Sequence, residues 1–95
     1  PTVVARVQDV PRGGGVVLAD QKLVLTRTAD DVIRCFSATC THQGCLVTSV
    51  SDRAIDCPCH GSQFDVATGE VLAGPARSPL AAVPVAIQGD AVVTA

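Results

Sequence analysis

The residues that most constrain this fold are cysteines and histidines gathered in one central stretch. Four of the five cysteines and both histidines lie between Cys40 and His60. They form two short boxes, Cys-Thr-His-Gln-Gly-Cys at 40–45 and Cys-Pro-Cys-His-Gly-Ser at 57–62. Thiolates and imidazoles are side chains that bind zinc and iron. We therefore expect the two boxes to be loops that meet at one metal centre.

The spacing within each box indicates which side chains can share that centre. Cys40 and His42 are two residues apart, so on an extended loop their side chains point to the same side. Cys57 and His60 are three residues apart in a segment that also contains proline and glycine, which suits a tight turn. Each loop can therefore offer one thiolate and one imidazole.

Each box holds one further cysteine, Cys45 in the first and Cys59 in the second. A disulfide between them would tie the loops together over the metal, and it would imply an oxidising compartment. The fifth cysteine, Cys35, lies in an apolar-rich strand pattern, and we expect it to be a buried free thiol.

Two metal centres suit a set of two cysteines and two histidines. One is a structural zinc ion. The other is a [2Fe–2S] cluster in which two histidines replace two cysteines on one iron. Two ferric ions, two sulfides and four thiolates carry a charge of minus two, whereas two neutral imidazoles in place of two thiolates bring it to zero. An added electron then meets less repulsion. The potential rises to about −150 to +300 mV, against about −400 mV for plant-type clusters.

Together the two boxes resemble the double signature of the Rieske iron–sulfur proteins. The resemblance extends to Gly-Pro-Ala-Arg-Ser-Pro-Leu at 74–80, which is similar to the proline-containing loop that covers the cluster in this family. It implies one [2Fe–2S] cluster per chain. Cys40 and Cys57 would bind one iron, and His42 and His60 would bind the other, outer iron.

The resemblance also implies roles for residues around the ligands. Ser62 stands where high-potential members have a serine that donates to a cluster sulfide. Phe64 stands where those members often have a tyrosine that donates to a ligand cysteine, so its missing hydrogen bond predicts a lower potential within the high range. Gly44 and Pro75 are further residues expected to lie around the cofactor.

The cysteine pair outside the ligand set separates this chain from some Rieske-type proteins. The resemblance implies a disulfide between Cys45 and Cys59. Rieske-type ferredoxins and ring-hydroxylating oxygenases share the ligands but usually lack that pair.

The rest of the chain predicts an all-β fold. Short apolar segments alternate with turn signals, and none shows a long helical period, so the pattern indicates a sandwich or barrel. The resemblance implies a Rieske-type antiparallel β-sandwich with a small cluster-binding subdomain at about 38–79, within a single domain, 1–95. Pro84 suggests an edge position or a bulge in the strand expected at 80–87. The expected strands are 2–7, 16–19, 23–28, 32–37, 46–50, 54–56, 63–66, 71–72, 80–87 and 91–94.

The composition argues against some classes of binding partner. The net charge is −2 and only two residues are aromatic, Phe36 and Phe64, which argues against binding to nucleic acid. No apolar run approaches the ~20 residues of a membrane span. The chain has no methionine, even at its start, so we expect that a segment such as a signal or anchor was removed upstream of Pro1.

Three functions are compatible with these features. The first is one-electron transfer by a stand-alone or lipid-anchored extracytoplasmic carrier, in the periplasm or on the outer face of the cytoplasmic membrane. The second is the Rieske subunit of a quinol-oxidising cytochrome bc-type complex or of an arsenite oxidase. The third is a structural zinc module. The short chain and the modest insertion between the boxes favour the first.

The expected partner is a redox protein, such as a cytochrome, or a quinol. An electron-transfer protein or a redox subunit of an oxidoreductase fits the chain better than a stand-alone enzyme does.

Overall fold

The fold is built almost entirely from short strands. The computed structural model describes residues 2–41, 44–51, 54–59 and 61–94, and these ranges contain ten strands, two short 3-10 helices and no α-helix. The all-β class predicted from the sequence is confirmed. The helices are η1 (Val7–Asp9) and η2 (Ala19–Gln21). The strands are β1 (Thr2–Arg6), β2 (Gly14–Leu18), β3 (Leu23–Arg27), β4 (Ile33–Ser37), β5 (Ser49–Val50), β6 (Ala54–Asp56), β7 (Gln63–Asp65), β8 (Val71–Ala73), β9 (Val85–Gln88) and β10 (Ala91–Thr94).

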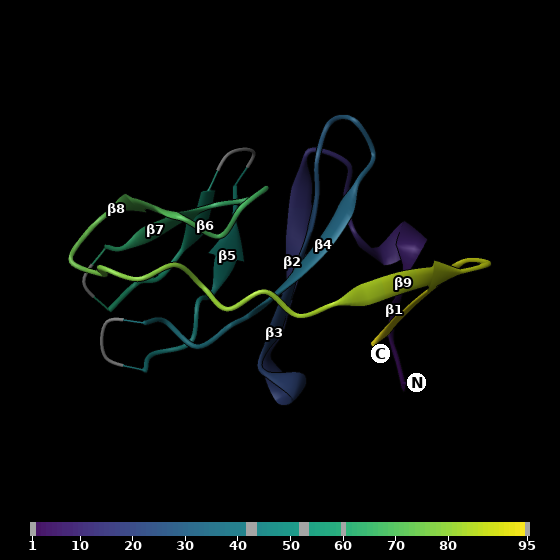
Figure 1. Ribbon diagram of the computed structural model, residues 1–95, viewed down its shortest axis with the longest axis horizontal. Helices are drawn as coiled ribbons and strands as arrows, with labels where there is room; N and C mark the ends of the chain where they lie inside the picture. The colour runs from purple at the N-terminus through teal and green to yellow at the C-terminus, as the bar shows by residue number, and fades with distance from the viewer. Residues whose placement is uncertain (1, 42–43, 52–53, 60, 95) are drawn as a thin grey trace.

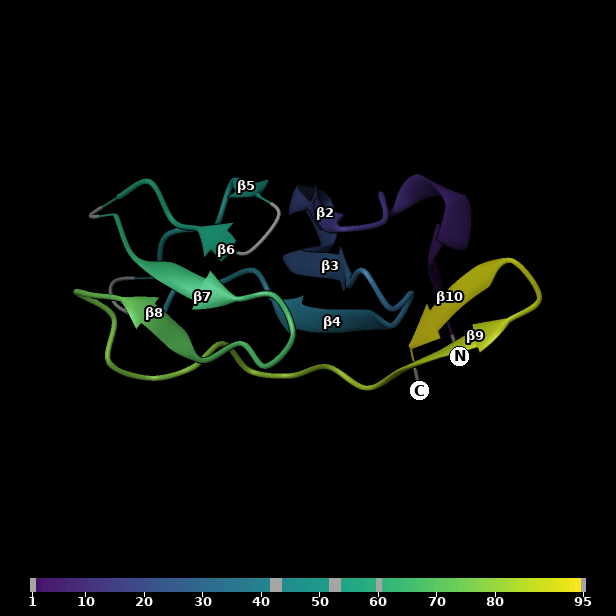
Figure 2. The ribbon, with the colours of Figure 1, turned by 90° about the horizontal axis from the view of Figure 1, so that it is seen from above.

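The strands form three antiparallel sheets (Figures 1 and 2). Their strand orders are β1-β10-β9, β2-β3-β4 and β5-β6-β7-β8. Most neighbours are also consecutive in the sequence, as hairpins require. The exception is β1, which pairs with β10 and sets Thr2 opposite Thr94. Both chain ends therefore lie in one sheet, at the opposite end of the molecule from β8.

The sheet β2-β3-β4 is the middle layer of the molecule. Successive side chains of a strand point to opposite faces, and the two faces of this sheet contribute to different apolar clusters. Val24 and Phe36 are opposite one another in the register and belong to the cluster shared with the four-stranded sheet. Leu25 and Cys35 are the next opposed pair and pack with Val92 of the sheet that holds the chain ends. Figure 2 shows the three sheets side by side in this order.

Two apolar clusters hold the layers together, and both are mainly aliphatic. The two aromatic residues, Phe36 and Phe64, lie in the first of them. Its buried members are Val24, Phe36, Ala38, Cys40, Val47, Ile55, Cys57, Phe64, Ala76 and Leu80. The buried members of the second are Val4, Val10, Leu25, Cys35 and Val92.

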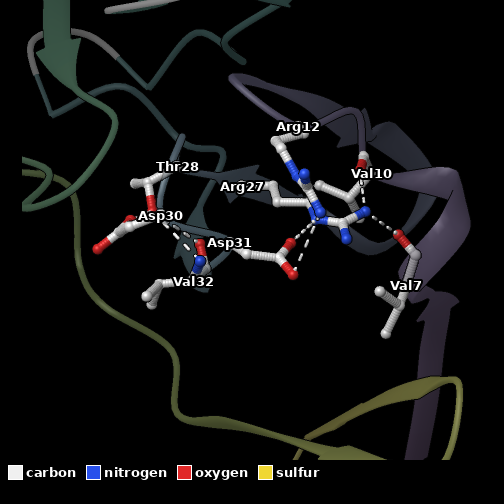
Figure 3. A network of polar contacts seen from close by, with 8 residues as sticks. All are labelled: Val7, Val10, Arg12, Arg27, Thr28, Asp30, Asp31 and Val32. Atoms are coloured by element: carbon white, nitrogen blue, oxygen red, sulfur yellow. Dashed lines mark hydrogen bonds and ion pairs between the residues drawn. The ribbon is translucent and has the colours of Figure 1, made fainter.

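A charged side chain fastens the connection between β1 and β2 to the middle sheet (Figure 3). The guanidinium of Arg27 donates from Nη1 to the carbonyl oxygens of Val7 at 3.3 Å and Val10 at 3.2 Å. Its Nε donates to Oδ1 of Asp31 at 2.5 Å, and the exposed Arg12 reaches Oδ2 of the same carboxylate at 3.5 Å. The Val7 oxygen also accepts the Val10 N–H at 3.1 Å, so the guanidinium adds a second contact there and ties both carbonyl groups to β3.

The segment expected as one strand at 80–87 is divided, so that prediction was wrong in its extent. Residues 81–83 follow the edge of β4: Ser37 N–H donates to the Ala81 oxygen at 2.8 Å, and Val83 N–H donates to the Cys35 oxygen at 2.9 Å. Pro84 has no N–H to continue this pairing. The chain then turns away, and β9 begins at Val85 in a different sheet.

Neither of the helices in the described ranges is long and apolar enough to cross a membrane.

Candidate metal centre

The first box is a tight loop that follows β4. Thr39 and Leu46 form an isolated antiparallel bridge at its base. Within it, Cys40 N–H donates to the Cys45 oxygen at 2.6 Å, and Gly44 N–H donates back to the Cys40 oxygen at 3.0 Å. Gly44 has φ of 73°, a conformation that glycine adopts without the penalty other residues face. The glycine expected near the cofactor therefore closes the loop that carries Cys40.

The second box is the connection between β6 and β7. Their pairing sets Asp56 opposite Gln63, and one step further Cys57 N–H donates to the Ser62 oxygen at 2.9 Å. Gly61 has φ of 80°, which allows the loop to turn before Ser62. The hairpin thus holds Cys57 and Ser62 at opposite sides of the base of the loop.

A disulfide between Cys45 and Cys59 joins the two boxes. The S–S distance is 1.99 Å, the Cα atoms are 6.5 Å apart, and 14 positions separate the two cysteines in sequence. The structure thus contains the link between the loops that the sequence led us to expect.

The two remaining box cysteines, Cys40 and Cys57, are free and almost completely buried, at 3% and 2% exposed. Burial raises the pKa of the Cys57 thiol, and the adjacent Cys40 thiol raises it further through its hydrogen bond and its charge. A hydrogen bond with the backbone of Cys59 acts in the opposite direction. A buried thiol such as that of Cys57 resists ionisation, whereas a metal ion favours the thiolate. The pair therefore fits a metal centre.

The other two expected ligands, His42 and His60, lie outside the described residues. Within the described ranges no group of three His, Cys, Asp or Glu side chains is arranged to hold a metal ion. The four-residue ligand set therefore stays a prediction that rests on the sequence and on the paired thiols.

The loop between β8 and Leu80 packs against both boxes. Ala76 N–H donates to Oγ of Ser62 at 3.1 Å, and both residues are buried. Oγ1 of Thr41 donates to the carbonyl oxygen of Ser78 at 2.6 Å. One contact goes to each box, so the loop bridges the two boxes, and its expected position over the cluster stays a prediction. Pro75 lies in this loop and is exposed.

Neither of these two contacts was predicted from the sequence. Thr41 belongs to the first box, which was a signal that its hydroxyl lies near the site. The acceptor, a carbonyl 37 positions away, could not be identified without the fold.

Phe64 packs in the apolar cluster that also contains Cys40 and Cys57. It lies on β7 opposite Ile55 of β6 and is completely buried. The ring is thus part of the apolar packing in which the two thiols are buried. Whether the absence of a tyrosine hydroxyl there changes a potential is not tested by this packing, and it stays a prediction.

Comparisons with known proteins agree on one family. The Rieske [2Fe-2S] domain family matches residues 1–84. The cytochrome b6-f complex iron–sulfur subunit of Chlorobaculum thiosulfatiphilum is 34% identical over 92 residues, which cover 95% of this chain and 50% of that subunit. This chain thus spans about half the length of that curated relative.

Two solved structures extend the comparison to the fold. A ferredoxin of Sphingomonas yanoikuyae B1 superposes with a TM-score of 0.80 at 28% identity, covering 98% of this chain and 95% of the ferredoxin. A cyanobacterial plasma membrane Rieske protein from Synechocystis PCC 6803 gives a TM-score of 0.71 at 24% identity, covering 100% of this chain and 99% of that protein, a likeness of fold alone.

The family match decides between the two metal centres that the sequence left open. It covers both boxes and most of the remaining chain. The zinc alternative is set aside, and a [2Fe–2S] cluster is the cofactor. The chain belongs to the Rieske [2Fe-2S] family.

Proposed function

We propose that this protein works outside the cytoplasm as a carrier of single electrons. The observation that carries the proposal is the disulfide between Cys45 and Cys59, which joins the two boxes. Disulfides persist in oxidising compartments and are rare in the cytosol. A bond that fastens both ligand loops would make cluster retention depend on such a compartment.

We propose the following roles for the residues of the site. Cys40 and Cys57 hold one iron as thiolates, and His42 and His60 hold the other as imidazoles. The bound cluster supplies reversible one-electron chemistry. The paired, buried thiols support the first assignment, and the donor set of the two boxes supports the second. Phe64 and its apolar neighbours keep water from the inner side of the thiol pair.

The described parts of the boxes also favour exchange of electrons with a separate partner. Gly44, Pro58, Cys59 and Gly61 are all exposed, although the thiols behind them are buried. A partner can therefore approach the loops closely. A redox protein such as a cytochrome fits this surface, and so does a quinol.

A second candidate is the Rieske subunit of a quinol-oxidising complex of the cytochrome bc type. The similarity to a cytochrome b6-f complex iron–sulfur subunit favours it. The two candidates differ in the immediate electron donor. In the complex the donor is a quinol, whereas a stand-alone carrier would receive its electron from another redox protein. The Rieske subunit of an arsenite oxidase is the alternative enzyme complex, and its electrons would come from arsenite and not from a quinol.

The test begins with electron paramagnetic resonance of the dithionite-reduced protein during a redox titration. We expect the spectrum of a mixed Cys/His [2Fe–2S] cluster and a potential within about −150 to +300 mV. Cys40→Ser should abolish the spectrum. The matched control is Cys35→Ala, which removes the cysteine outside the boxes and should leave the spectrum unchanged. A full spectrum in Cys40→Ser would contradict the ligand assignment.

The compartment is tested separately. The full chain is produced once with an export signal and once without it, and unreduced peptides that contain Cys45 and Cys59 are analysed by mass spectrometry. We expect the disulfide and a full cluster only in exported protein. Free thiols at both positions in exported protein that retains its cluster would overturn the extracytoplasmic proposal.

A further inference from the structure

The loop that bridges the two boxes carries a single charged side chain, Arg77. The rest of that loop, 74–79, is Gly, Pro, Ala, Ser and Pro. The described residues of the two boxes add no acidic or basic side chain apart from the cysteine thiols. The guanidinium is therefore the one fixed positive charge among the described residues of these three loops, on a chain whose net charge is −2.

The backbone on either side of Arg77 is held in place. Ala76, the residue before it, donates to Oγ of Ser62 at 3.1 Å, and Ser78, the residue after it, accepts from Oγ1 of Thr41 at 2.6 Å. Arg77 is exposed between these two anchors. Together with Thr41, Pro75 and Ser78 it lines an open cleft of about 350 Å³. The charge is thus held at a defined position beside both boxes.

This guanidinium has no carboxylate partner among the residues that the structure describes. Other arginines do: Arg6 pairs with Asp90, and Arg12 and Arg27 both pair with Asp31. An unpaired guanidinium keeps its full charge and its planar fork of donors, which matches a carboxylate in a bidentate geometry.

Charges around an electron-transfer site act mainly on encounter and orientation with a partner. A positive group beside the redox site of a protein with negative net charge favours the approach of a negative partner at that group. We propose that Arg77 is the docking anchor for an acidic surface on the redox partner, and that a carboxylate of that partner occupies the cleft. This inference rests on the electron-transfer function proposed above.

The test uses the cluster-loaded full chain, reduced, and two inorganic oxidants of opposite charge. Hexacyanoferrate(III), a trianion, stands in for an acidic partner, and tris(phenanthroline)cobalt(III), a trication, stands in for a basic one. Each takes one electron from the reduced cluster, so the metal of the oxidant falls from the +3 to the +2 state. Stopped-flow mixing gives the second-order rate constant for each oxidant.

The measured quantity is the ratio of the anionic to the cationic rate constant, because a change in cluster potential alters both rates in the same direction. For Arg77→Gln we expect this ratio to fall by roughly tenfold or more at about 10 mM ionic strength, since one charge acts on two probes of opposite sign. The difference should largely disappear at about 1 M salt, where the Debye length is near 3 Å. Arg77→Lys keeps the charge and should keep the ratio.

Arg34→Gln is the matched control. Arg34 lies on β4, is also exposed, and has no ion pair among the described residues. Removing it changes the net charge equally, but from a strand of the middle sheet and not from the three loops, so we expect a clearly smaller effect on the ratio than that of Arg77→Gln. Equal ratios in the two glutamine variants, or an unchanged ratio in Arg77→Gln, would overturn the docking role. A wild-type chain that binds no cluster or takes up no electron would instead refute the proposed function.

Discussion

At the scale of single residues, Ser62 connects the backbone to the cofactor site. Its hydroxyl oxygen accepts the N–H of Ala76, and the side chain is 1% exposed. Among the described residues, nothing accepts the proton of that hydroxyl. A buried hydroxyl rarely leaves its proton unused. The proton is therefore available for an acceptor on the cofactor, which is consistent with the sulfide contact implied by the resemblance.

We predict that Ser62→Ala lowers the reduction potential. A hydrogen bond to the cluster stabilises the reduced state, which carries more negative charge, and contributes about 1 kcal/mol net. For one electron, 59 mV is tenfold in the equilibrium constant, so the fall is roughly 40 mV or more. Protein-film voltammetry measures it. Ser78→Ala removes an exposed hydroxyl in the covering loop and is the control. A shift of only a few millivolts in Ser62→Ala would exclude the donor role.

A second prediction at this scale concerns the Cys35 thiol and the pH dependence of stability. Burial raises its pKa to about 11 from the usual 9.0. Between pH 9.0 and about 11 the folded protein keeps the thiol proton, whereas the unfolded chain loses it. The resulting stabilisation is complete below pH 9 and is lost as the pH rises towards 11. We expect the free energy of unfolding to fall by about 2 kcal/mol across that window.

Urea unfolding at several pH values, with wild type and Cys35→Ala compared, isolates this effect. The chain contains no tyrosine, so no phenol titrates in the same range. Parallel pH profiles for the two proteins would show that Cys35 does not titrate as its burial indicates.

At the scale of elements, the connection between β1 and β2 depends on Arg27. Its hydrogen bonds to the Val7 and Val10 carbonyls would be lost in Arg27→Ala, and hydrogen bonds to charged groups contribute about 1.5–3 kcal/mol each. We therefore predict a loss of about 3 kcal/mol or more in the free energy of unfolding, measured by chemical denaturation. Arg12→Ala removes only an exposed pair with Asp31 and should cost less than about 1 kcal/mol. Equal losses in the two variants would mean that the carbonyl contacts contribute little.

The disulfide gives a prediction for the two ligand loops. Replacing Cys45 and Cys59 with serine opens a closed loop of 14 positions, which corresponds to about 3 kcal/mol in the chain-entropy model. We expect the melting temperature to fall by about 4–8 °C for each kcal/mol. The cluster should also be lost more readily. Each single variant should match the double variant, because either substitution breaks the same bond. Additive effects of the two single variants in calorimetry would contradict this.

At the scale of the whole molecule, the middle sheet lies between the two outer sheets and packs against both. Thr26 is a completely buried residue of β3, and its Oγ1 donates to the Val66 oxygen, just after β7, at 2.7 Å. This bond joins the middle layer to the layer that carries the second box. The same boundary contains the apolar cluster to which Val24, Ile55 and Phe64 belong.

We predict that Thr26→Val weakens this boundary by about 1 kcal/mol, because the variant keeps the shape of the side chain but leaves the Val66 oxygen without its donor. Amide hydrogen exchange in β7 should become faster than in wild type, whereas exchange in β10 should stay the same. Thr26→Ser keeps the hydroxyl and serves as the control. Faster exchange in all sheets alike would show that the layers unfold as one unit.

The sequence predicted the local features of this molecule better than its long-range pairing. The two boxes located the site, because cysteine and histidine at that spacing have few other uses, and turn residues located most strands. The sheet order was not predictable in the same way. The pairing of β1 with β10 joins the two ends of the chain, and no local pattern specifies it. The division of the segment 80–87 followed from Pro84, but the partner of each half depended on β4 and β10 being in place.

The pairing of β1 with β10 has a mechanical consequence. Thr2 and Thr94 lie opposite one another at the same end of this antiparallel pair. A force applied to both ends of the chain therefore pulls across the ladder, and its hydrogen bonds, which run perpendicular to the strands, are loaded one after another. That geometry unzips at low force. The sheet at the chain ends would peel open first, while the covering loop and the two boxes, at the far end of a molecule 38 Å long, stay unloaded.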